Sequence, residues 1–385
     1  MTLIELMVAL VIGLGVTLAV TTLLIAGENH KRTTTATNDA EQTGAYVFHA
    51  LDGALRGAGS AFAQSAYPSP DAGVLGCKLN AGGILPRAGT FPVPFNAAAL
   101  LGGAASNLRV APLLIAPAKS PDGVSDVVVV MGGSGAAGGV SRQVTAAGGA
   151  TVLTLDNAVG FVPSDLVLVS QSGTPDCLLE EVLTVATPTL NLGPTQAYYT
   201  LGGVTTISTL AASTLSFVTP LGNAVANNLQ FELLGVDTNH TLYSYDLLQN
   251  RSLVQSPGVA DAPQPIADGV YRMNAIYGVD TNGDGIQDNW AGPTDLNYDI
   301  NSVMTTPATQ RQIVSVRLAL VVRGEYYDKN TVTPPTLTLF AGLTNAALAP
   351  LQQAVNISAI DQHYRYRVFE FTVPLRNMIL LAGGP

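Results

Sequence analysis

Charged residues are scarce in this sequence. Lys and Arg together number 17, Asp and Glu number 27, and these four types make up only 11% of the 385 residues. The formal net charge is −10 and the few cations are scattered, which excludes a nucleic-acid-binding surface because phosphate contacts need clustered Lys and Arg. Hydrophobic residues reach 47%, which indicates a protein that also buries surface against neighbouring subunits.

Metal-binding and catalytic patterns are also lacking. The only two cysteines, Cys77 and Cys177, stand outside any CxxC or Cys/His spacing, so a zinc site is not expected. No Ser or Cys lies in a nucleophile-elbow context. The sequence therefore favours a protein without enzymatic activity. The four histidines form no HExxH pair, and they are His30, His49, His240 and His363.

A long hydrophobic run opens the chain. Residues 1–26 contain one ionisable side chain, Glu5, and are long enough to cross the ~30 Å hydrocarbon core of a bilayer as a helix. The run lacks the basic flank and the small-residue cleavage site of a secretory signal peptide. We therefore expect a membrane segment that remains on the protein.

Glu5 is the unusual residue of this run, because a carboxylate near the start of a membrane helix costs a few kcal/mol unless it is neutralised. The first basic residues along the same helix, Lys31 and Arg32, are more than ~35 Å away at 1.5 Å per residue. A neighbouring subunit can supply the partner. The alternative is a lone carboxylate that extends to the membrane interface.

The run TLIELMVAL, with Glu at position 5, resembles the mature N-terminus of a type IV pilin or a type II secretion pseudopilin. The resemblance implies that prepilin peptidase removes a short leader and that Met1 is then the N-methylated terminus. It also implies that Glu5 neutralises the α-amine of the adjacent subunit during assembly. The protein would reside in the inner membrane and then, through the pilus assembly machinery, in an extracellular filament.

The helix is expected to continue past the hydrophobic run. Residues 27–59 form its amphipathic half, which predicts that this half lies on a sheet and ends near Gly57 or Gly59. Copies of the chain or homologous pilins would pack through residues 1–57. The apolar positions recur at helical spacing, and they are Ala40, Gly44, Val47, Phe48, Leu51 and Leu55.

Residues 60–192 are predicted to contain an irregular connection, up to about residue 117, and a first β subdomain. The strand signals are SDVVVVMGG, ATVLTLDN, DLVLVSQSG and CLLEEVLTV. Gly133, Gly135 and Gly138 have the spacing of a dinucleotide-binding loop. The residues that follow lack the period of a crossover helix, so we favour a Gly-rich hairpin over a Rossmann fold.

Residues 193–385 are predicted to form a second β subdomain. NLQFELLGVD and TLYSYDLL, joined by TNH, are typical of a hairpin, and QIVSVRLALVV alternates as a half-buried strand. The blocks YGVDTNGDGIQD, VRLALVVRGE and FTVPLRN resemble PilW-like minor pilins, as does SDLVLVSQSGTPDC. Residues 60–117 and 330–362 match no block. In the exported protein that this resemblance implies, we expect Cys77 and Cys177 to form a disulfide.

The segment VDTNGDGIQDNW follows the first nine positions of an EF-hand-type calcium loop. Ala291 replaces the bidentate Glu at the twelfth position, and Asp295 or Asp299 could fold back as a further ligand. We predict one structural Ca²⁺; the alternative is an Asp/Gly-rich turn between strands. The predicted ligands are the side chains of Asp280, Asn282, Asp284 and Asp288 and the carbonyl of Ile286.

These patterns predict an α+β protein with the type IV pilin fold, in which a long N-terminal helix packs on an enlarged antiparallel β-rich domain. Its expected function is that of a structural filament subunit that polymerises through the helix. The alternatives are a minor pilin or pseudopilin that primes or tips the filament, and a membrane-anchored ligand-binding or adhesion module. A nucleotide-dependent enzyme is the most distant alternative.

Overall fold

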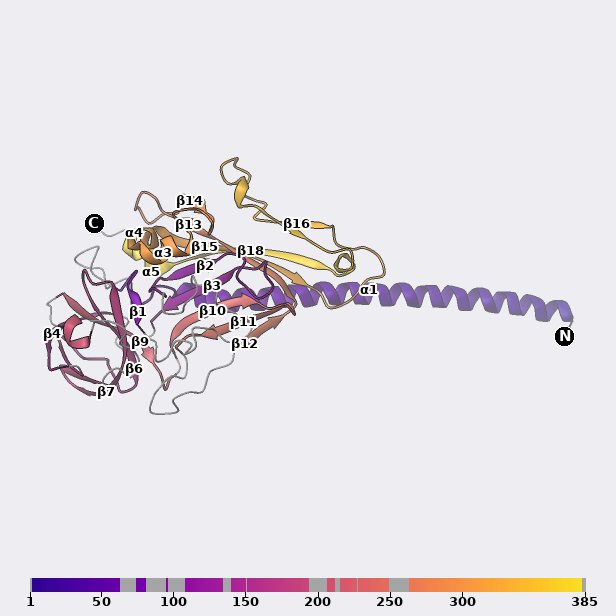
Figure 1. Cartoon of the computed structure of the whole chain (residues 1–385). Helices are drawn as coiled ribbons and strands as arrows, with labels where there is room; N and C mark the ends of the chain where they lie inside the picture. Colours follow the sequence, from indigo (N-terminus) through magenta and orange to yellow (C-terminus); the bar gives the residue numbers. More distant parts are fainter. Residues whose placement is uncertain are drawn as a thin grey trace.

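A long helix and a β-rich body make up the described chain. In Figure 1 the helix α1 (Leu3–Gly57) projects far beyond the body. Strands and short helices follow it, so the predicted α+β class with pilin-like architecture is confirmed. The computed structural model describes residues 2–62, 74–80, 95, 108–133, 140–149, 151–193, 206–211, 215–226, 228–248 and 263–382.

The helix α1 ends where the sequence predicted. Its last residue is Gly57, and Gly59 adopts a φ of +75°, which favours glycine. The Gly59 amide donates a hydrogen bond to the Met131 carbonyl at 2.8 Å, which ties the helix exit to a strand. At 1.5 Å per residue, its 55 residues span about 80 Å.

Two sheets enclose the main hydrophobic core. One has the strand order β12-β11-β10-β3-β2 and the other the order β14-β13-β15-β18. The predicted hairpin is confirmed as β10 and β11, which pair in antiparallel orientation. The first sheet consists of β2 (Leu113–Ala116), β3 (Val127–Gly132), β10 (Gln230–Val236), β11 (Thr241–Asp246) and β12 (Gln264–Asp268). The second consists of β13 (Val270–Val279), β14 (Asn289–Ala291), β15 (Ile313–Arg323) and β18 (Tyr366–Pro374).

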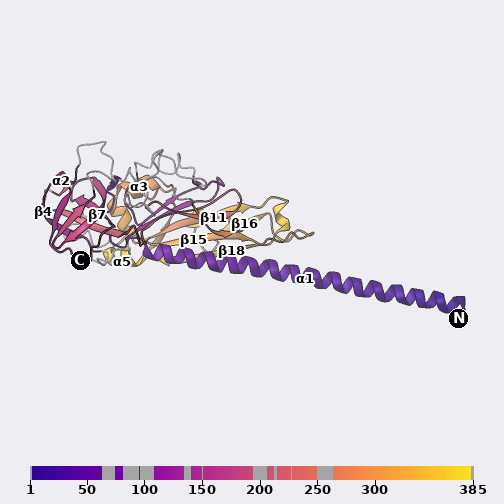
Figure 2. The same cartoon turned by 90° about the horizontal axis from the view of Figure 1, so that it is seen from below.

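The helix α1 closes the main core between the edges of these two sheets. It contacts β18, the edge strand of one sheet, and β12, the edge strand of the other. Figure 2 shows its C-terminal half running along the body beside β15 and β18. The sheets are also joined directly, because the Tyr277 hydroxyl accepts a hydrogen bond from the Ile115 amide at 2.6 Å.

The strand β15 is buried on both faces. Val316, Leu318 and Leu320 face the main core, as the alternation predicted. Ala319 and Val321 face a second apolar cluster, which the segment 330–362 covers. This segment forms a hairpin of β16 (Thr336–Leu339) and β17 (Gln353–Asn356), with the 3-10 turns η4 (Ala349–Leu351) and η5 (Asp361–His363).

A third sheet carries a core of its own. Its order is β1-β7-β6-β9-β4-β5-β8, and β7 also pairs with β8, so the six strands from β4 to β9 close into a ring. We call these six strands the barrel; Figure 1 shows it at the end of the body away from the N-terminus. Its sheet consists of β1 (Lys78–Asn80), β4 (Arg142–Ala147), β5 (Val152–Leu155), β6 (Asp165–Gln171), β7 (Asp176–Ala186), β8 (Thr189–Leu192) and β9 (Ser216–Asn223).

The sheets do not follow the two predicted β subdomains, residues 60–192 and 193–385. β2 and β3 pair with β10 and its neighbours, whereas β9 belongs to the barrel, so no sheet boundary falls at residue 192. The Gly-rich hairpin is wrong, because β3 and β4 lie in different sheets. Gly135 and Gly138 fall outside the described residues. β2 is a strand within the connection that was expected to be irregular.

The short helices are α2 (Ile207–Leu210), α3 (Ile300–Thr305), α4 (Pro307–Gln312) and α5 (Arg376–Ala382).

Candidate functional site: the N-terminal helix and its seat

Among the described residues, the N-terminal half of α1 lies apart from the body (Figure 1). Every side chain from residue 2 to residue 28 is exposed, although the run is long and apolar enough to cross a membrane. Hydroxyl groups within it donate to carbonyls of the preceding turn, as Thr17 does to the Leu14 carbonyl at 2.9 Å. Hydroxyl groups that hydrogen-bond within their own helix suit an apolar environment, where no water is present to accept from them. This half of α1 is therefore a candidate surface for lipid or for other helices.

Glu5 has a partner on its own helix. Thr2 is the N-cap of α1, and its amide donates a hydrogen bond to Glu5 Oε2 at 2.8 Å in a capping-box arrangement. The neutralisation of Glu5 by a neighbouring subunit stays a prediction, and this hydrogen bond adds a partner that the search for a cation did not consider. The T-x-x-E pattern of residues 2–5 is the sequence signal for it. Met1 lies outside the described residues.

The second half of α1 is seated on the body through small residues and aromatic contacts. A Cβ atom at Gly44 would overlap the ring of Phe369 on β18. One turn later, Phe48 meets Phe371 edge-on with ring centroids 4.6 Å apart. Of the apolar positions predicted for this half, Ala40, Val47, Leu51 and Leu55 are buried in the main core, whereas Phe48 is 40% exposed.

Polar contacts with β18 complete this seat, and the sequence analysis missed them. Arg367 forms an ion pair with Glu41 at 3.6 Å, and Arg365 donates to the Thr33 hydroxyl at 3.4 Å. These residues occur in the alternating run YRYRVFEF, whose partner on α1 is more than 300 residues away in sequence. No local pattern connects the two segments.

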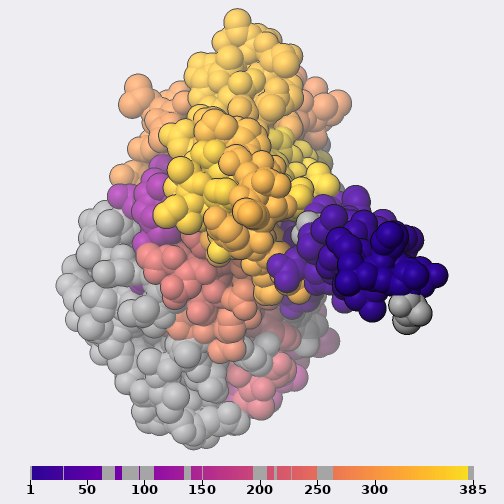
Figure 3. All heavy atoms as spheres, turned by 90° about the vertical axis from the view of Figure 1, so that its right-hand side faces the viewer, coloured from indigo at the N-terminus to yellow at the C-terminus, as the bar shows by residue number. Residues whose placement is uncertain are grey.

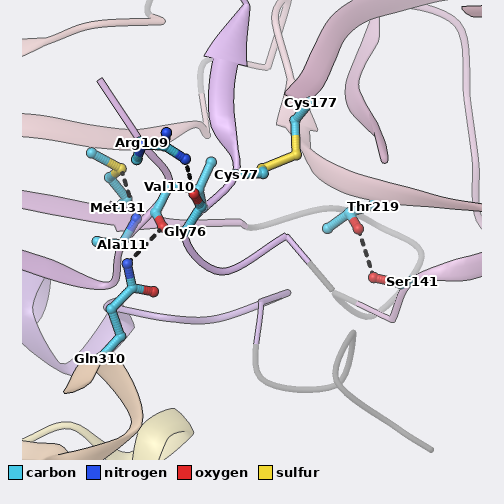
Figure 4. The surroundings of a disulfide bond; sticks show 10 residues. All are labelled: Gly76, Cys77, Arg109, Val110, Ala111, Met131, Ser141, Cys177, Thr219 and Gln310. Atoms are coloured by element: carbon cyan, nitrogen blue, oxygen red, sulfur yellow. Dashed lines mark hydrogen bonds between the residues drawn. A yellow bond between two sulfur atoms is a disulfide. The ribbon is translucent and has the colours of Figure 1, made fainter. Parts of the chain in front are cut away.

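The predicted disulfide between Cys77 and Cys177 is confirmed. Their Cα atoms are 5.7 Å apart, and Figure 4 shows the bond between the segment before β1 and the start of β7. β1 pairs with β7 in parallel orientation beside it. The Arg109 side chain donates to the Gly76 carbonyl at 2.8 Å and holds the neighbouring turn. The disulfide therefore links a strand of the barrel to the segment before β1 at a point where both cysteines are buried in the main core.

The calcium-type loop connects β13 to β14, between two strands as predicted. Asp280 is buried and accepts hydrogen bonds on both carboxylate oxygens, from the Gly283 amide at 2.7 Å and the Gly285 amide at 2.7 Å. Asp288 accepts from the Thr281 amide and hydroxyl, each at 2.8 Å. The hydrogen bond from the Thr281 amide, followed by that from its hydroxyl, is the main cause that lowers the pKa of Asp288.

The loop therefore closes on its own hydrogen bonds. Asn282 accepts from the Asp284 amide and Asp284 from the Ile286 amide, at 2.9 and 2.8 Å. Within the described ranges, no three His, Cys, Asp or Glu side chains gather closely enough to hold a metal ion. Asp295 and Asp299 serve other turns, where they accept from the Gly292 and Ser302 amides. Calcium binding by this loop stays a prediction.

A buried acid in the barrel is a further residue that the sequence analysis missed. Glu180 lies on β7 between Leu178 and Val182, which face the barrel core, and its exposed fraction is 0%. Neither carboxylate oxygen has a hydrogen-bond partner in the described part of the chain. Burial is the main cause that raises the pKa of Glu180 to about 8, and the charge of Glu181 is a smaller contribution in the same direction. The two adjacent acids in CLLEEVLTV are the sequence signal.

Comparison with known families identifies part of the chain. The family described as type IV Pilus-assembly protein W, PilW, matches residues 236–377. This range runs from the end of β10 through the hairpin of β16 and β17 to β18, the strand that seats α1. No curated protein and no solved structure matches the chain.

Proposed function

Because residues 236–377 form a domain of the PilW family, we propose that the chain is a structural subunit of a type IV pilus-type extracellular filament. The observation that carries the proposal is the junction of this domain with α1. The domain's last strand, β18, holds the helix, and residues 2–28 extend away from the body with every residue exposed. Burial of so much apolar surface against neighbouring helices, at about 25 cal/mol per Å², would hold a polymer together.

The protein would occupy two environments in succession, the membrane and then the filament. Residues 1–26 would first reside in the inner membrane, and after extraction by the pilus assembly machinery they would pack in the filament core. The partners would be other copies of the chain or homologous pilins. Repetition of one helix-to-helix contact generates an open polymer, as a filament requires. We assign the chain a structural role and no enzymatic one.

A minor pilin or pseudopilin that primes or tips the filament is the second candidate. The observation that favours it is the barrel, which enlarges the end of the body away from the N-terminus (Figure 1). The two candidates differ in copy number. Quantitative mass spectrometry of sheared filaments separates them, because a bulk subunit dominates the preparation and a tip subunit is a trace component. A membrane-anchored adhesion module would be absent from the filaments.

Substitution of Glu5 tests the mechanism of assembly. Glu5→Ala removes both the charge and the bond to the Thr2 amide, whereas Glu5→Gln removes the charge and keeps a capping side chain. If Glu5 neutralises the α-amine of the adjacent subunit, both variants should insert into the membrane but be depleted from sheared filaments. Quantification of the chain in membranes and filaments provides the measurement.

Normal incorporation of Glu5→Gln with depletion of Glu5→Ala would mean that Glu5 only caps its helix. Normal incorporation of both would contradict the proposed assembly role. N-terminal sequencing of the same filaments tests whether Met1 is the methylated terminus.

We also propose that the β13–β14 loop binds one structural Ca²⁺ through Asp280, Asn282, Asp284 and Asp288 and the Ile286 carbonyl. Carboxylate, amide and carbonyl oxygens are the ligand types that calcium takes. What supports the proposal is the ligand spacing. Because the loop already satisfies Asp280 and Asp288 internally, the ion would stabilise an existing loop and not create it.

A further inference from the structure

We propose that the end of the body from which α1 emerges is a membrane-interface surface that rests on the phospholipid headgroups before the subunit is extracted. We call residues 324–332 and 358–366 the collar. The inference rests on the proposed membrane residence of α1 and adds a second contact with the lipid. Figure 3 views this end, where the orange and yellow atoms of the C-terminal third lie beside the indigo helix.

The collar follows α1 toward the N-terminus. Gly324 lies against Ala36, since a Cβ atom there would be 2.7 Å from the Ala36 carbonyl oxygen. Asp328 is paired with Arg365 at 3.0 Å, and Arg365 in turn donates to Thr33. From residue 324 to residue 328 the chain thus moves from the level of Ala36 to that of Thr33, toward the apolar half of the helix.

The spacing along α1 brings this level close to the bilayer. The apolar run ends at Ala26, and the seven residues from there to Thr33 rise about 10 Å. A bilayer of about 40 to 45 Å with a 30 Å hydrocarbon core has a headgroup layer of about 5 to 7 Å on each side. Side chains that project from a loop beside Thr33 therefore reach the outer part of this layer.

The exposed side chains of the collar have the chemistry of such an interface. Tyr326, Tyr327 and Ile360 are 43%, 53% and 73% exposed, which places three large apolar bodies in solvent on one end of a domain. Tyrosine is enriched at membrane surfaces because its ring is apolar and its hydroxyl polar. The exposed Lys329 can extend its ammonium group to lipid phosphates.

Ring contacts and ion pairs connect the two segments of the collar, and two of its three acids are in ion pairs. Tyr327 stacks on His363 with ring centroids 4.9 Å apart and meets Tyr364 edge-on. Asp328 pairs with Arg365, and Asp361 pairs with Arg323 at 3.5 Å. The third acid, Glu325, is exposed, and the exposed Lys329 in the same segment carries the opposite charge. Lipid phosphates would therefore meet a surface with little net repulsion, which suits contact with headgroups.

The test uses the full chain reconstituted in phospholipid vesicles that carry a nitroxide on the lipid headgroup. Tyr327→Trp places a fluorophore in the collar. Tyr46→Trp is the matched control, because Tyr46 is also an exposed tyrosine, 58% exposed, on α1. It lies 13 residues beyond Thr33, about 20 Å farther from the bilayer. The natural Trp290 contributes the same background emission to both variants.

We expect the nitroxide to quench the emission of Tyr327→Trp and to leave that of Tyr46→Trp unchanged. Ile360→Trp should repeat the result from the other collar segment, which guards against a folding defect at position 327. If the chain floats with the vesicles but the nitroxide quenches the collar variants no more than it quenches Tyr46→Trp, the collar assignment alone is overturned. A chain that does not float with vesicles contradicts the proposed membrane residence, and the collar assignment fails with it.

Discussion

Glu180 shows how a single residue can make this fold sensitive to pH. Its carboxyl group is fully buried in the barrel, and burial raises its pKa to about 8, from 4.5 in the unfolded chain. Between these two values the native state holds a proton that the unfolded chain releases. The free energy of unfolding should therefore fall as pH rises through this window, by at most about 1.4 kcal/mol per pH unit.

The variant Glu180→Gln should abolish this part of the pH dependence. The amide keeps the size of the side chain and carries no charge, so the variant should be more stable than the parent at pH 8 and similar at pH 4.5. Denaturant unfolding of the full chain in detergent at both pH values provides the measurement. Glu325→Gln at an exposed site is the control. An unchanged difference between the two pH values in Glu180→Gln would contradict the assignment.

The calcium-type loop is a question at the scale of one element. With no bidentate Glu, we expect a dissociation constant of about 10⁻⁴ to 10⁻³ M, typical of extracellular modules. At a Ca²⁺ concentration ten times that constant, binding would stabilise the protein by about 1.4 kcal/mol. Melting curves of the full chain in detergent, with millimolar Ca²⁺ and with chelator, measure the shift.

Substitution of Asp280 would disrupt the loop itself, because its carboxylate accepts hydrogen bonds from three backbone amides of the loop. A variant at Asp284 separates loss of calcium binding from loss of the loop structure. Asp284→Asn retains an oxygen for the Ile286 amide and removes one charged ligand. It should reduce the calcium-dependent shift and leave the melting point in chelator nearly unchanged. Equal melting points of the parent with calcium and with chelator would mean that the segment is only a turn.

The helix α1 is an element with two environments. Its N-terminal half is exposed, whereas its C-terminal half is fitted to β18 so closely that a Cβ atom at position 44 would force the ring of Phe369 to shift. Under the proposed function, the first half would contact lipid and later neighbouring helices, while the second half keeps a fixed position on the body. A filament subunit needs both.

At the scale of the whole molecule, the disulfide fastens β7 of the barrel to the segment before β1, and both cysteines are buried in the main core. Cys77 and Cys177 are separated by 100 residues, and closure of a loop of this size stabilises by about 4.7 kcal/mol in the chain-entropy model. The double variant Cys77→Ser, Cys177→Ser should lose stability of that order. Thermal unfolding of the full chain in detergent measures it, with the parent under reducing conditions as the comparison. An unchanged midpoint in the double variant would show that the sheet contacts alone hold the barrel in place.

The sequence by itself determined the features whose signals act within a few residues. The length and the two faces of α1 follow from the spacing of apolar residues and from the glycines at its end. The β10–β11 hairpin and the position of the β13–β14 loop follow from their turn residues. The buried faces of β15 follow from the alternation of its apolar side chains. The capping of the Thr2 amide by the Glu5 carboxylate belongs to this group, because the pattern spans only four residues.

Only the tertiary structure decided which strands share a sheet and what each sheet covers. β3 pairs with β10, about a hundred residues later, and leaves β4, its neighbour in sequence, to the barrel. The seat of α1 on β18 and the burial of Glu180 also depend on segments far apart in the chain. Such contacts repay the entropy of closing a long loop only when many of them form together. Their energy belongs to the assembled core, and no short stretch of the sequence contains it.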